Sequence, residues 1–304
     1  MKLKIATRSS KLALWQADYF AALVTRNIPE ATTEIVPLVT DGDRIQDRPL
    51  HEVEGKTLFI KEVENALLSG AADAAVHCIK DYHPRTPPEF VIAAYLERES
   101  DRDLLIARQP ISGIDDLAQG ALVGTTSQRR IFFMRKRRPD LKFAMLRGNI
   151  NTRLNKLYSG NFDAIILAEA GINRLGIRLE HYCTLPDEIM LPAVGQGALV
   201  VEVCAKETAL AEQLRQFNHV PTQICSQAER AFVSGLSADC KSAVGVICRL
   251  NDDGTLLLKG HVGHPETLEE VSGQLSGPAD QAKALGNALA ADFLDRGAAR
   301  ILDV

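Results

Sequence analysis

The chain of 304 residues has no long apolar stretch. No run approaches the roughly 20 consecutive apolar residues that a membrane-spanning helix needs, so we expect no membrane partner. The opening residues MKLKIATR lack both the apolar core of a signal peptide and the Arg- and Ser-rich pattern of a transit peptide. These absences favour a cytoplasmic protein.

The chain lacks closely paired cysteines, and this spacing argues against two common roles. None of the six cysteines belongs to a CxxC pair or to a close Cys/His group, which is against a structural zinc site and a disulfide framework. We therefore expect reduced thiols and no bound metal. The cysteines are Cys78, Cys183, Cys204, Cys225, Cys240 and Cys248.

Two of these cysteines differ in their surroundings. Cys248 lies in the apolar run VGVICRL and is typical of a buried structural thiol, whereas Cys240 lies in the polar segment GLSADCKSAVG. No adjacent His or helix start activates Cys240. The residues alone leave open whether Cys240 is a spare cysteine or one with a chemical role.

The overall composition is that of a soluble globular protein, but the charge is unevenly distributed. Hydrophobic residues make up 46% of the chain and charged residues 24%, and the net charge is −4. Between residues 124 and 160, ten Lys and Arg stand against the single acid Asp140, which gives this segment a charge of +9. We expect such a segment to bind something negative.

Short apolar runs alternate with helical patterns over residues 1–200, which is typical of an α/β fold with largely parallel sheets. A charged segment at 97–103 separates two groups of predicted strands, and we place a hinge there. The predicted strands are 3–7, 34–39, 74–79, 90–96, 103–107, 121–125, 142–146 and 163–168.

The C-terminal end of the chain predicts a smaller α+β domain. Two β runs flank the turn NDDG (251–254), which is a hairpin signal. A helix is expected to begin near Pro278 and to end at Gly297. Its buried face would carry Ala282, Leu285, Leu289 and Phe293.

Basic residues gather at three predicted strand-to-helix turns, IATRSSKLALWQA, LVGTTSQRR and MLRGNINTRLNKL. Free N–H groups and the helix dipole at such a turn attract anions, and Arg can bind a carboxylate through two parallel hydrogen bonds. The polar and basic residues of these turns are Arg8, Ser10, Thr126, Ser127, Arg129, Arg130, Arg147 and Arg153.

Each turn also has a simpler interpretation, because Ser or Thr before a helix is most often an N-cap. Three turns that each carry Arg nevertheless favour a small ligand with several carboxylates. The rival ligand is nucleic acid, but the turns lack interleaved aromatic residues and the whole chain is acidic, so we expect none. The run 135–138 is typical of a solvated helix end before Pro139 rather than of a ligand site.

An acid follows another predicted strand. In AAVHCIKDYHP, Lys80 and Asp81 lie at the carboxyl end of the strand, where a carboxylate beside cations can hold a charge or transfer a proton. The alternative is that Asp81 caps a turn before Pro84. We interpret His77 as a core histidine with a hydrogen-bond partner.

Taken together, these motifs resemble the porphobilinogen deaminase (hydroxymethylbilane synthase) family. The resemblance is carried in family order, from residue 5 to residue 203, by IATRSSKLALWQA, GKTLFIKEVENALL, AAVHCIKD, GTTSQRR, LRGNINTRLNKL, DAIILAEAGINRLG and LPAVGQGALVVEV. The motif AERAFV and Cys240 extend it towards the C-terminus.

The resemblance implies a monomeric transferase of tetrapyrrole and heme biosynthesis. It would condense four porphobilinogen molecules head to tail into 1-hydroxymethylbilane and release ammonia, with a dipyrromethane cofactor attached covalently through Cys240. The implied fold has two periplasmic-binding-protein-like domains with mostly parallel, mixed sheets and a smaller C-terminal α+β domain. We expect these domains at 1–97 with 198–216, at 102–192 and at 219–304.

The same resemblance implies roles for single residues. Asp81 matches the catalytic aspartate, which would protonate the leaving amino group and then stabilise a cationic azafulvene. Besides Cys240, the cofactor would be held by Lys80, Thr126, Ser127, Arg129, Arg130, Arg147 and Arg153. The substrate would be bound by Arg8, Ser10, Lys56 and Arg174, with Lys56 in a loop over the site.

The chain departs from the family pattern in three places. Ser237-Ala238-Asp239 replaces the usual Glu-Gly-Gly before the cysteine, Asp41 stands where an uncharged or basic residue is common, and KDYHPRTPP differs from the usual continuation after the aspartate. Two alternatives therefore accompany the main prediction. One is a non-catalytic two-lobed anion-binding protein, and the other is a degenerate family member that does not load its cofactor.

Overall fold

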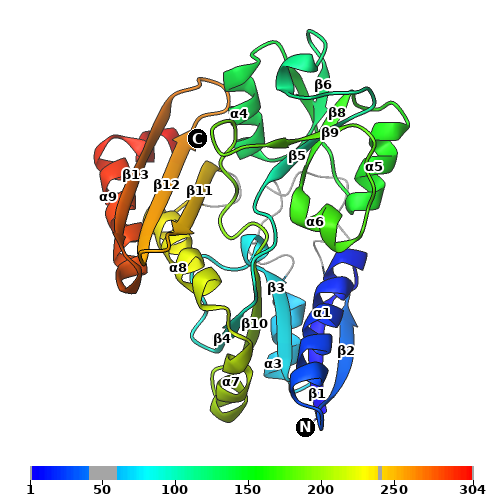
Figure 1. Cartoon of the computed structure of the whole chain (residues 1–304), viewed down its shortest axis with the longest axis vertical. Coiled ribbons are helices and arrows are strands. Elements are labelled where there is room, and N and C mark those ends of the chain that lie inside the picture. The colour runs from blue at the N-terminus through cyan, green and yellow to red at the C-terminus, as the bar shows by residue number, and fades with distance from the viewer. Residues whose placement is uncertain (1, 41–59, 239–241, 303–304) are drawn as a thin grey trace. The chain divides into compact units, whose positions relative to one another are not determined.

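The computed structural model describes residues 2–40, 60–238 and 242–302. Within these ranges the chain forms two compact units (Figure 1). The first comprises residues 1–99 and 198–223, and the second comprises 100–197 and 224–304. No helix in the described ranges is long and apolar enough to cross a membrane.

The first unit is built on a mixed five-stranded sheet in the order β2-β1-β3-β10-β4. Strands β1, β2 and β3 run parallel, and β10 lies antiparallel between β3 and β4. The strands are β1 (Lys2–Arg8), β2 (Thr32–Leu38), β3 (Ala74–Cys78), β4 (Phe90–Tyr95) and β10 (Leu199–Cys204). The helices and 3₁₀ turns are α1 (Lys11–Asn27), α3 (Lys61–Leu68), α7 (Thr208–Leu214), η2 (Ile79–Asp81) and η4 (Arg215–Phe217).

The second unit contains a sheet of the same kind in the order β7-β6-β8-β5-β9. Strands β6, β7 and β8 run parallel, and β5 lies antiparallel between β8 and β9. The strands are β5 (Asp103–Ala107), β6 (Leu122–Gly124), β7 (Lys142–Ala144), β8 (Ala164–Ala168) and β9 (Tyr182–Leu185). The helices and the 3₁₀ turn are α4 (Gln128–Arg137), α5 (Ile150–Tyr158), α6 (Glu169–Arg174) and η3 (Ile114–Asp116).

The C-terminal part of the second unit is an antiparallel three-stranded sheet in the order β11-β12-β13, packed on helices. Phe232 and Phe293 meet edge to face in this core, with ring centroids 5.1 Å apart. The strands are β11 (Ala243–Leu250), β12 (Thr255–Gly263) and β13 (Glu270–Pro278). The helices and the 3₁₀ turn are α8 (Val220–Gly235), α9 (Ala282–Asp295), α10 (Ala298–Leu302) and η5 (Ala279–Gln281).

The predicted fold class is confirmed: an α/β chain with two mostly parallel, mixed sheets and a smaller α+β part. All eight predicted strands are present with small differences at their ends, and the NDDG hairpin is the turn between β11 and β12. The helix expected after Pro278 is α9, whose buried face includes the four predicted apolar residues. Strands β9, β10 and β13 were not predicted. The polar, Gly-containing sequence EVSGQLSGP of β13 has no strand-like apolar pattern because its side chains are mostly exposed.

Candidate active site

One edge of the second sheet gathers two of the three predicted turns, after β6 and β7, together with the turn that follows β8. Because β6, β7 and β8 are parallel neighbours, their carboxyl ends lie at the same edge, and each leads into a helix: α4, α5 and α6. The Ser127 hydroxyl caps α4 by accepting the N–H of Arg130 (3.4 Å). The Asn149 side chain caps α5 by accepting the N–H of Thr152 (2.9 Å). The N-cap interpretation is therefore confirmed for Ser127, and Asn149 serves in the same way.

The turn between β7 and α5 fixes its basic side chains through hydrogen bonds to main-chain carbonyls. Gly148 has φ +110, and a Cβ there would lie 2.8 Å from a Thr152 side-chain carbon, so only glycine fits. Arg153 Nε donates to the Gly148 carbonyl (2.8 Å), and Lys156 Nζ donates to the Arg147 carbonyl (3.1 Å). Arg147 is buried and Arg153 is half-buried. The turn is thus fixed by hydrogen bonds from Arg153 and Lys156 to its main chain.

A buried ion cluster lies at the first turn of α4. Arg129 and Arg130 are 4% and 8% exposed, and their guanidiniums hold the two carboxylate oxygens of Asp103 at 2.8 and 2.7 Å. Arg129 also donates to the Leu191 carbonyl (2.6 Å), and Arg130 donates to the Ile166 carbonyl (2.7 Å).

The cluster fixes the charge state of its members. Burial alone would raise the pKa of Asp103, but the two guanidiniums hold it well below its usual range. Burial lowers the pKa of Arg129, with Asp103 opposing that effect. Asp103 therefore stays ionised and neutralises one of the two guanidinium charges, which leaves an excess of one positive charge.

The cluster also leaves one donor without a partner. Arg130 Nε is buried and makes no hydrogen bond with any residue that the structure describes. A buried unsatisfied donor is costly, and an anion that reaches it would relieve that cost. Together with the excess positive charge and with Arg147 and Arg153, this orphaned donor fits a ligand that carries several carboxylates.

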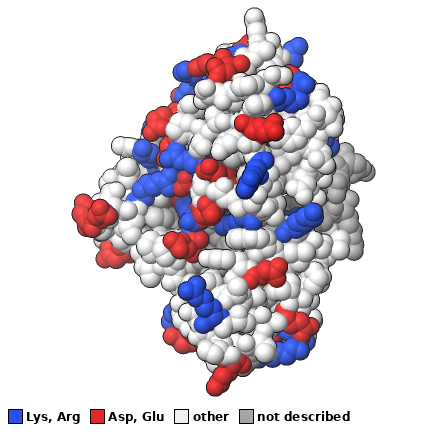
Figure 2. All heavy atoms as spheres, turned by 45° about the vertical axis from the view of Figure 1, so that its right-hand side comes forward, with Lys and Arg blue, Asp and Glu red and all other residues white. Residues whose placement is uncertain are grey.

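Part of the local charge excess of residues 124–160 is matched by acids from outside this segment, and Asp140 pairs within it. Lys136 pairs with Glu270 (2.6 Å), Arg137 pairs with Asp115 (2.8 Å), and Arg138 pairs with Asp140 (2.7 Å). Figure 2 shows Lys and Arg interspersed with Asp and Glu over the visible face. The run 135–138 forms the C-terminal end of α4, as predicted. The segment is therefore less basic in the folded chain than its sequence suggests.

An edge of the first sheet brings together two other predicted residues. Strands β1 and β3 are parallel neighbours, so Arg8 at the end of β1 and Asp81 at the end of η2 leave the sheet on the same side. Both line a small cavity of about 30 Å³ with residues of α1 and α3. Ser10 caps α1 by accepting the N–H of Ala13 (3.3 Å). The expected N-cap role is therefore confirmed for Ser10.

Asp81 itself is exposed, and Lys80 beside it is half-buried. The turn η2 is closed by the Tyr82 N–H, which donates to the Ile79 carbonyl (3.0 Å), without help from an Asp81 side-chain bond. Within the described ranges, the Asp81 carboxylate and the Lys80 ammonium form no ion pair. The carboxylate is thus accessible to a ligand.

The segment after Asp81 is tied to the core by a buried acid. Glu202 is fully buried and accepts a hydrogen bond from the Tyr82 hydroxyl. Its other oxygen lies 3.0 Å from His77 Nε2, which confirms His77 as a core histidine with a partner. His83 Nε2 lies 2.8 Å from the Glu64 carboxylate of α3. Residues on both sides of Asp81 are thereby held in place.

The remaining predicted site residues fall into two groups. Arg174 is buried at the end of α6 and donates to the Gly197 carbonyl (2.6 Å), and Thr126 is half-buried after β6. Cys240 and Lys56 lie outside the described residues.

Sequence reasoning missed Asp103 and Glu202. Each is an acid in an otherwise apolar strand, DLLIA and LVVEVC. Burying a carboxylate without a partner is very costly, so an isolated acid in such a run signals a buried ion pair or hydrogen-bond cluster.

The fold and these two sheet edges define an α/β protein with one edge suited to a small ligand that bears several carboxylates, and with another edge where an accessible carboxylate shares a cavity with an Arg. A family model described as porphobilinogen deaminase, dipyromethane cofactor binding domain, matches residues 3–212, and one described as porphobilinogen deaminase, C-terminal domain, matches residues 223–295. The chain belongs to the porphobilinogen deaminase family.

One curated relative agrees with this assignment. The chain is 43% identical over 297 residues to a porphobilinogen deaminase of Chromobacterium violaceum, covering 98% of this chain and 96% of the relative. Among solved structures, a probable amino-acid ABC transporter extracellular-binding protein from Bacillus subtilis is 12% identical, with a TM-score of 0.42, over 71% of this chain and 90% of that one. An ancestral cationic amino acid solute binding protein is 13% identical, with a TM-score of 0.43, over 71% and 87%.

Proposed function

We propose that this chain is a hydroxymethylbilane synthase, which condenses four porphobilinogen molecules head to tail into 1-hydroxymethylbilane. In each addition, the C–N bond of the substrate's aminomethyl group breaks and ammonia leaves. A C–C bond then forms between that methylene carbon and a free pyrrole carbon, which loses its proton. After four additions, water cleaves the finished chain from the enzyme and supplies the hydroxyl group of the product. The family match over nearly the whole chain supports this function.

Asp81 is proposed to carry the proton chemistry. An accessible carboxylate can give a proton to the leaving amino nitrogen and then, as an anion, stabilise the positive charge that develops on the substrate. The observation that carries this role is the shared cavity of Asp81 and Arg8, since Arg8 can hold a substrate carboxylate beside the acid. Lys80 would offset the negative charge of ligand carboxylates, and Ser10, Lys56 and Arg174 would complete the substrate contacts.

The cofactor is proposed to lie at the basic edge of the second sheet. When bound through Cys240, the dipyrromethane supplies the free pyrrole carbon to which the first substrate is joined. Arg130 would use its unpartnered Nε, and Arg147 and Arg153 would hold further carboxylates. Arg129, Thr126 and Ser127 would complete this cradle, with Asp103 keeping the two α4 guanidiniums in place.

Three further assignments accompany this function. We propose three domains, at 1–97 with 198–216, at 102–192 and at 219–304. The protein would work in the cytoplasm and as a monomer. These assignments follow the family resemblance of the sequence.

Intact-protein mass spectrometry after exposure to porphobilinogen tests the proposal. The unmodified sequence should carry an adduct of two pyrrole units and release ammonia, and Cys240→Ala should carry no adduct. Cys183→Ala is the matched control, because Cys183 is a half-buried thiol of β9, and it should keep the adduct. An unmodified, inactive wild-type chain would contradict the proposal and favour an anion-binding protein or a degenerate family member.

A further inference from the structure

A second pocket lies on the three-stranded sheet of the second unit, away from the residues assigned above. On β12, a Cβ at Gly260 would lie 2.6 Å from the Phe232 ring of α8, so this position points towards the helices. On β13, a Cβ at Gly273 would lie 3.3 Å from the Phe293 ring of α9. Since side chains alternate along a strand, Lys259 and His261 point to the opposite face.

The same face of β13 adds two polar side chains. Lys259 pairs with Gln274 in the register of β12 and β13, and His261 pairs with Ser272. Gln274 and Ser272 are exposed. The face turned away from the helices is therefore polar at these two strands.

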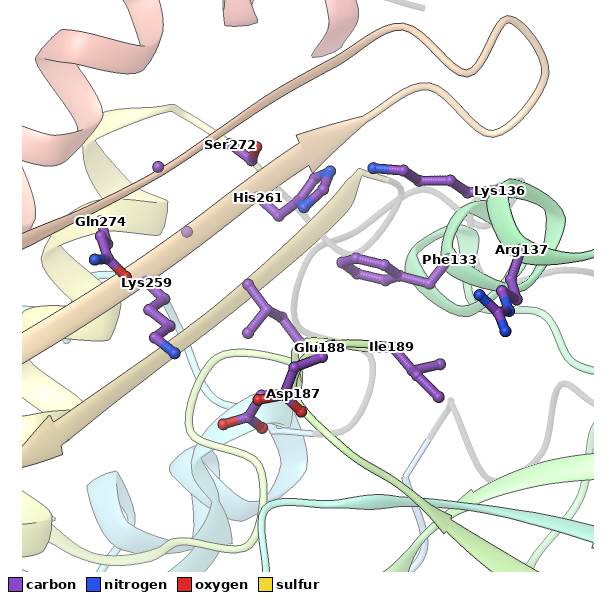
Figure 3. A pocket seen from close by; sticks show the side chains of 13 residues that line it. Phe133, Lys136, Arg137, Asp187, Glu188, Ile189, Lys259, His261, Ser272 and Gln274 are labelled. Atoms are coloured by element: carbon purple, nitrogen blue, oxygen red, sulfur yellow. The ribbon is translucent and has the colours of Figure 1, made fainter. Parts of the chain in front are cut away.

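At β11 this face of the sheet is covered by neighbouring elements, whereas at β12 and β13 it lines an open pocket. A Cβ at Gly245 of β11 would lie 2.7 Å from Leu191 and 3.1 Å from Phe133, so this strand packs tightly on the neighbouring elements. Beside it a pocket of about 630 Å³ remains, between the end of α4, residues 187–191 and the face of β12 and β13 (Figure 3). This volume lies within the range of small-molecule sites.

The pocket has an apolar side. Phe133, Ile189 and Leu191 line it, and Phe133 stacks edge to face on His261 with ring centroids 4.9 Å apart. Burial lowers the pKa of His261, against the opposing effect of Glu270, so His261 is neutral at pH 7. An apolar group of a ligand can therefore pack here without burying a charge.

Most charged side chains of the pocket already have partners. Lys136 pairs with Glu270 (2.6 Å), and Arg137 pairs with Asp115 (2.8 Å). Asp187 lies 3.2 Å from Arg102 and 3.3 Å from Arg249.

Two oppositely charged side chains of the pocket have no such partner among the described residues. Lys259 is half-buried and Glu188 is exposed, and neither forms an ion pair or hydrogen bond with a residue of the described ranges. In Figure 3 the Lys259 side chain extends from β12 towards the segment that carries Glu188. A half-buried ammonium attracts an anion, and a carboxylate attracts a cation, so the complementary ligand carries both charges.

We propose that this pocket binds a small zwitterion with an apolar body, whose carboxylate pairs with Lys259 and whose ammonium pairs with Glu188. The apolar body packs against Phe133 and Ile189, between these two polar ends. This site lies outside the proposed active site and makes no use of its residues.

A set of three probes tests this assignment on the full-length protein by isothermal titration calorimetry. The probe 4-(aminomethyl)benzoate carries both charges on an aromatic ring, whereas benzoate lacks the ammonium and benzylamine lacks the carboxylate. We expect 4-(aminomethyl)benzoate to bind with a Kd of about 1 mM or tighter and each single-charge analogue to bind about tenfold more weakly. Absence of saturable binding by 4-(aminomethyl)benzoate would overturn the proposal.

Matched variants locate the site. Lys259→Gln and Glu188→Gln should each weaken binding of 4-(aminomethyl)benzoate about tenfold, because each removes one charged hydrogen bond. Ser272→Trp keeps all charges and should abolish binding by filling the space beside His261. Lys283→Gln, at an exposed lysine of α9, makes the same charge change elsewhere and should leave binding unchanged. Equal affinities for wild type, Lys259→Gln and Ser272→Trp would place the ligand elsewhere and refute the assignment.

Discussion

The two five-stranded sheets share an arrangement of parallel and antiparallel strands but present different chemistry at equivalent edges. In each sheet three parallel strands end at the edge, and a Ser-capped helix follows one of them: Ser10 caps α1 and Ser127 caps α4. At this edge of the first sheet lies Asp81, an exposed acid that follows β3. At the equivalent edge of the second sheet lie Arg129 and Arg130, which are buried and paired with Asp103.

Under the proposed function, this difference would let one scaffold support two tasks. Cations fixed by a buried partner stay charged and stationary, which suits them to hold carboxylates. A carboxylate without such a partner can gain and lose a proton, which suits acid–base chemistry. The backbone provides the edge in both cases, and burial and pairing of the side chains suit each edge to its proposed task.

The largest expected effect comes from changing the exposed acid. Asp81→Asn keeps the shape of the side chain but removes its proton exchange, so we expect kcat to fall about 100-fold or more. The rate of product formation from porphobilinogen measures this. Glu89→Gln, an exposed acid before β4 of the same sheet, is the matched control and should retain the wild-type rate. Near-normal turnover of Asp81→Asn would contradict its proposed role.

A change at the buried ion cluster of the second sheet should mainly lower the stability of the fold. Asp103→Asn leaves two buried guanidiniums without a counter-charge, so the free energy of unfolding should fall by about 3–5 kcal/mol. Chemical denaturation followed by circular dichroism measures the loss. Asp115→Asn removes an exposed pair with Arg137 and should barely change stability. Equal stability of the two variants would argue against the buried cluster.

The same variant has a pH signature. The pKa of Asp103 is depressed in the folded chain, so its stabilising contribution is present above the unfolded value of about 3.9 and is lost as pH falls through the lower folded value. The stability difference between wild type and Asp103→Asn should therefore be constant near neutral pH and shrink below about pH 4. A difference that stays constant into acid would contradict the assigned charge state.

A smaller effect is expected from the hydrogen bond that anchors the segment after Asp81. Tyr82→Phe removes the donor to Glu202 but leaves His77 in contact with that carboxylate, so the loss should be about 1–2 kcal/mol. Thermal and chemical unfolding measure it. Tyr158→Phe, which changes an exposed tyrosine at the end of α5, serves as the control. If both variants unfold alike, the buried hydrogen bond contributes nothing.

The smallest expected effect concerns His261. Burial lowers its pKa in the folded chain, so its contribution to stability is present above the unfolded value of about 6.5 and is lost as pH falls through the lower folded value. Wild-type Tm should therefore drop slightly more between neutral pH and pH ~5 than the Tm of His261→Gln. Parallel pH profiles of the two proteins would show that His261 does not titrate as assigned.

The sequence predicted the strands and turns well because they depend on local patterns. Apolar runs predicted the strands β1 to β8. Ser and Arg after such runs predicted the strand-to-helix turns that contain Ser10, Ser127 and Arg147. Ion pairs and hydrogen bonds between residues far apart in the sequence have no such local pattern. Asp103 meets Arg129 and Arg130 only because β5 lies beside β8 and α4 packs on the same sheet, and the sequence does not reveal this order.

The same limit applies to the acid-bearing edge. Glu202 lies 120 residues after Tyr82, and only the antiparallel insertion of β10 beside β3 brings them together. The predicted excess positive charge was larger than the folded chain retains, because Asp115 and Glu270 come from other segments. The pocket at Lys259 likewise depends on packing that the sequence pattern does not encode.

The division of roles between the two edges is tested most directly by intact mass spectra of Asp81→Asn and Arg147→Leu after exposure to porphobilinogen. We expect Asp81→Asn to carry the two-pyrrole adduct at wild-type occupancy but to turn over little substrate, and Arg147→Leu to carry the adduct at reduced occupancy. The reverse pattern, with the adduct lost in Asp81→Asn and kept in full in Arg147→Leu, would contradict this division of roles.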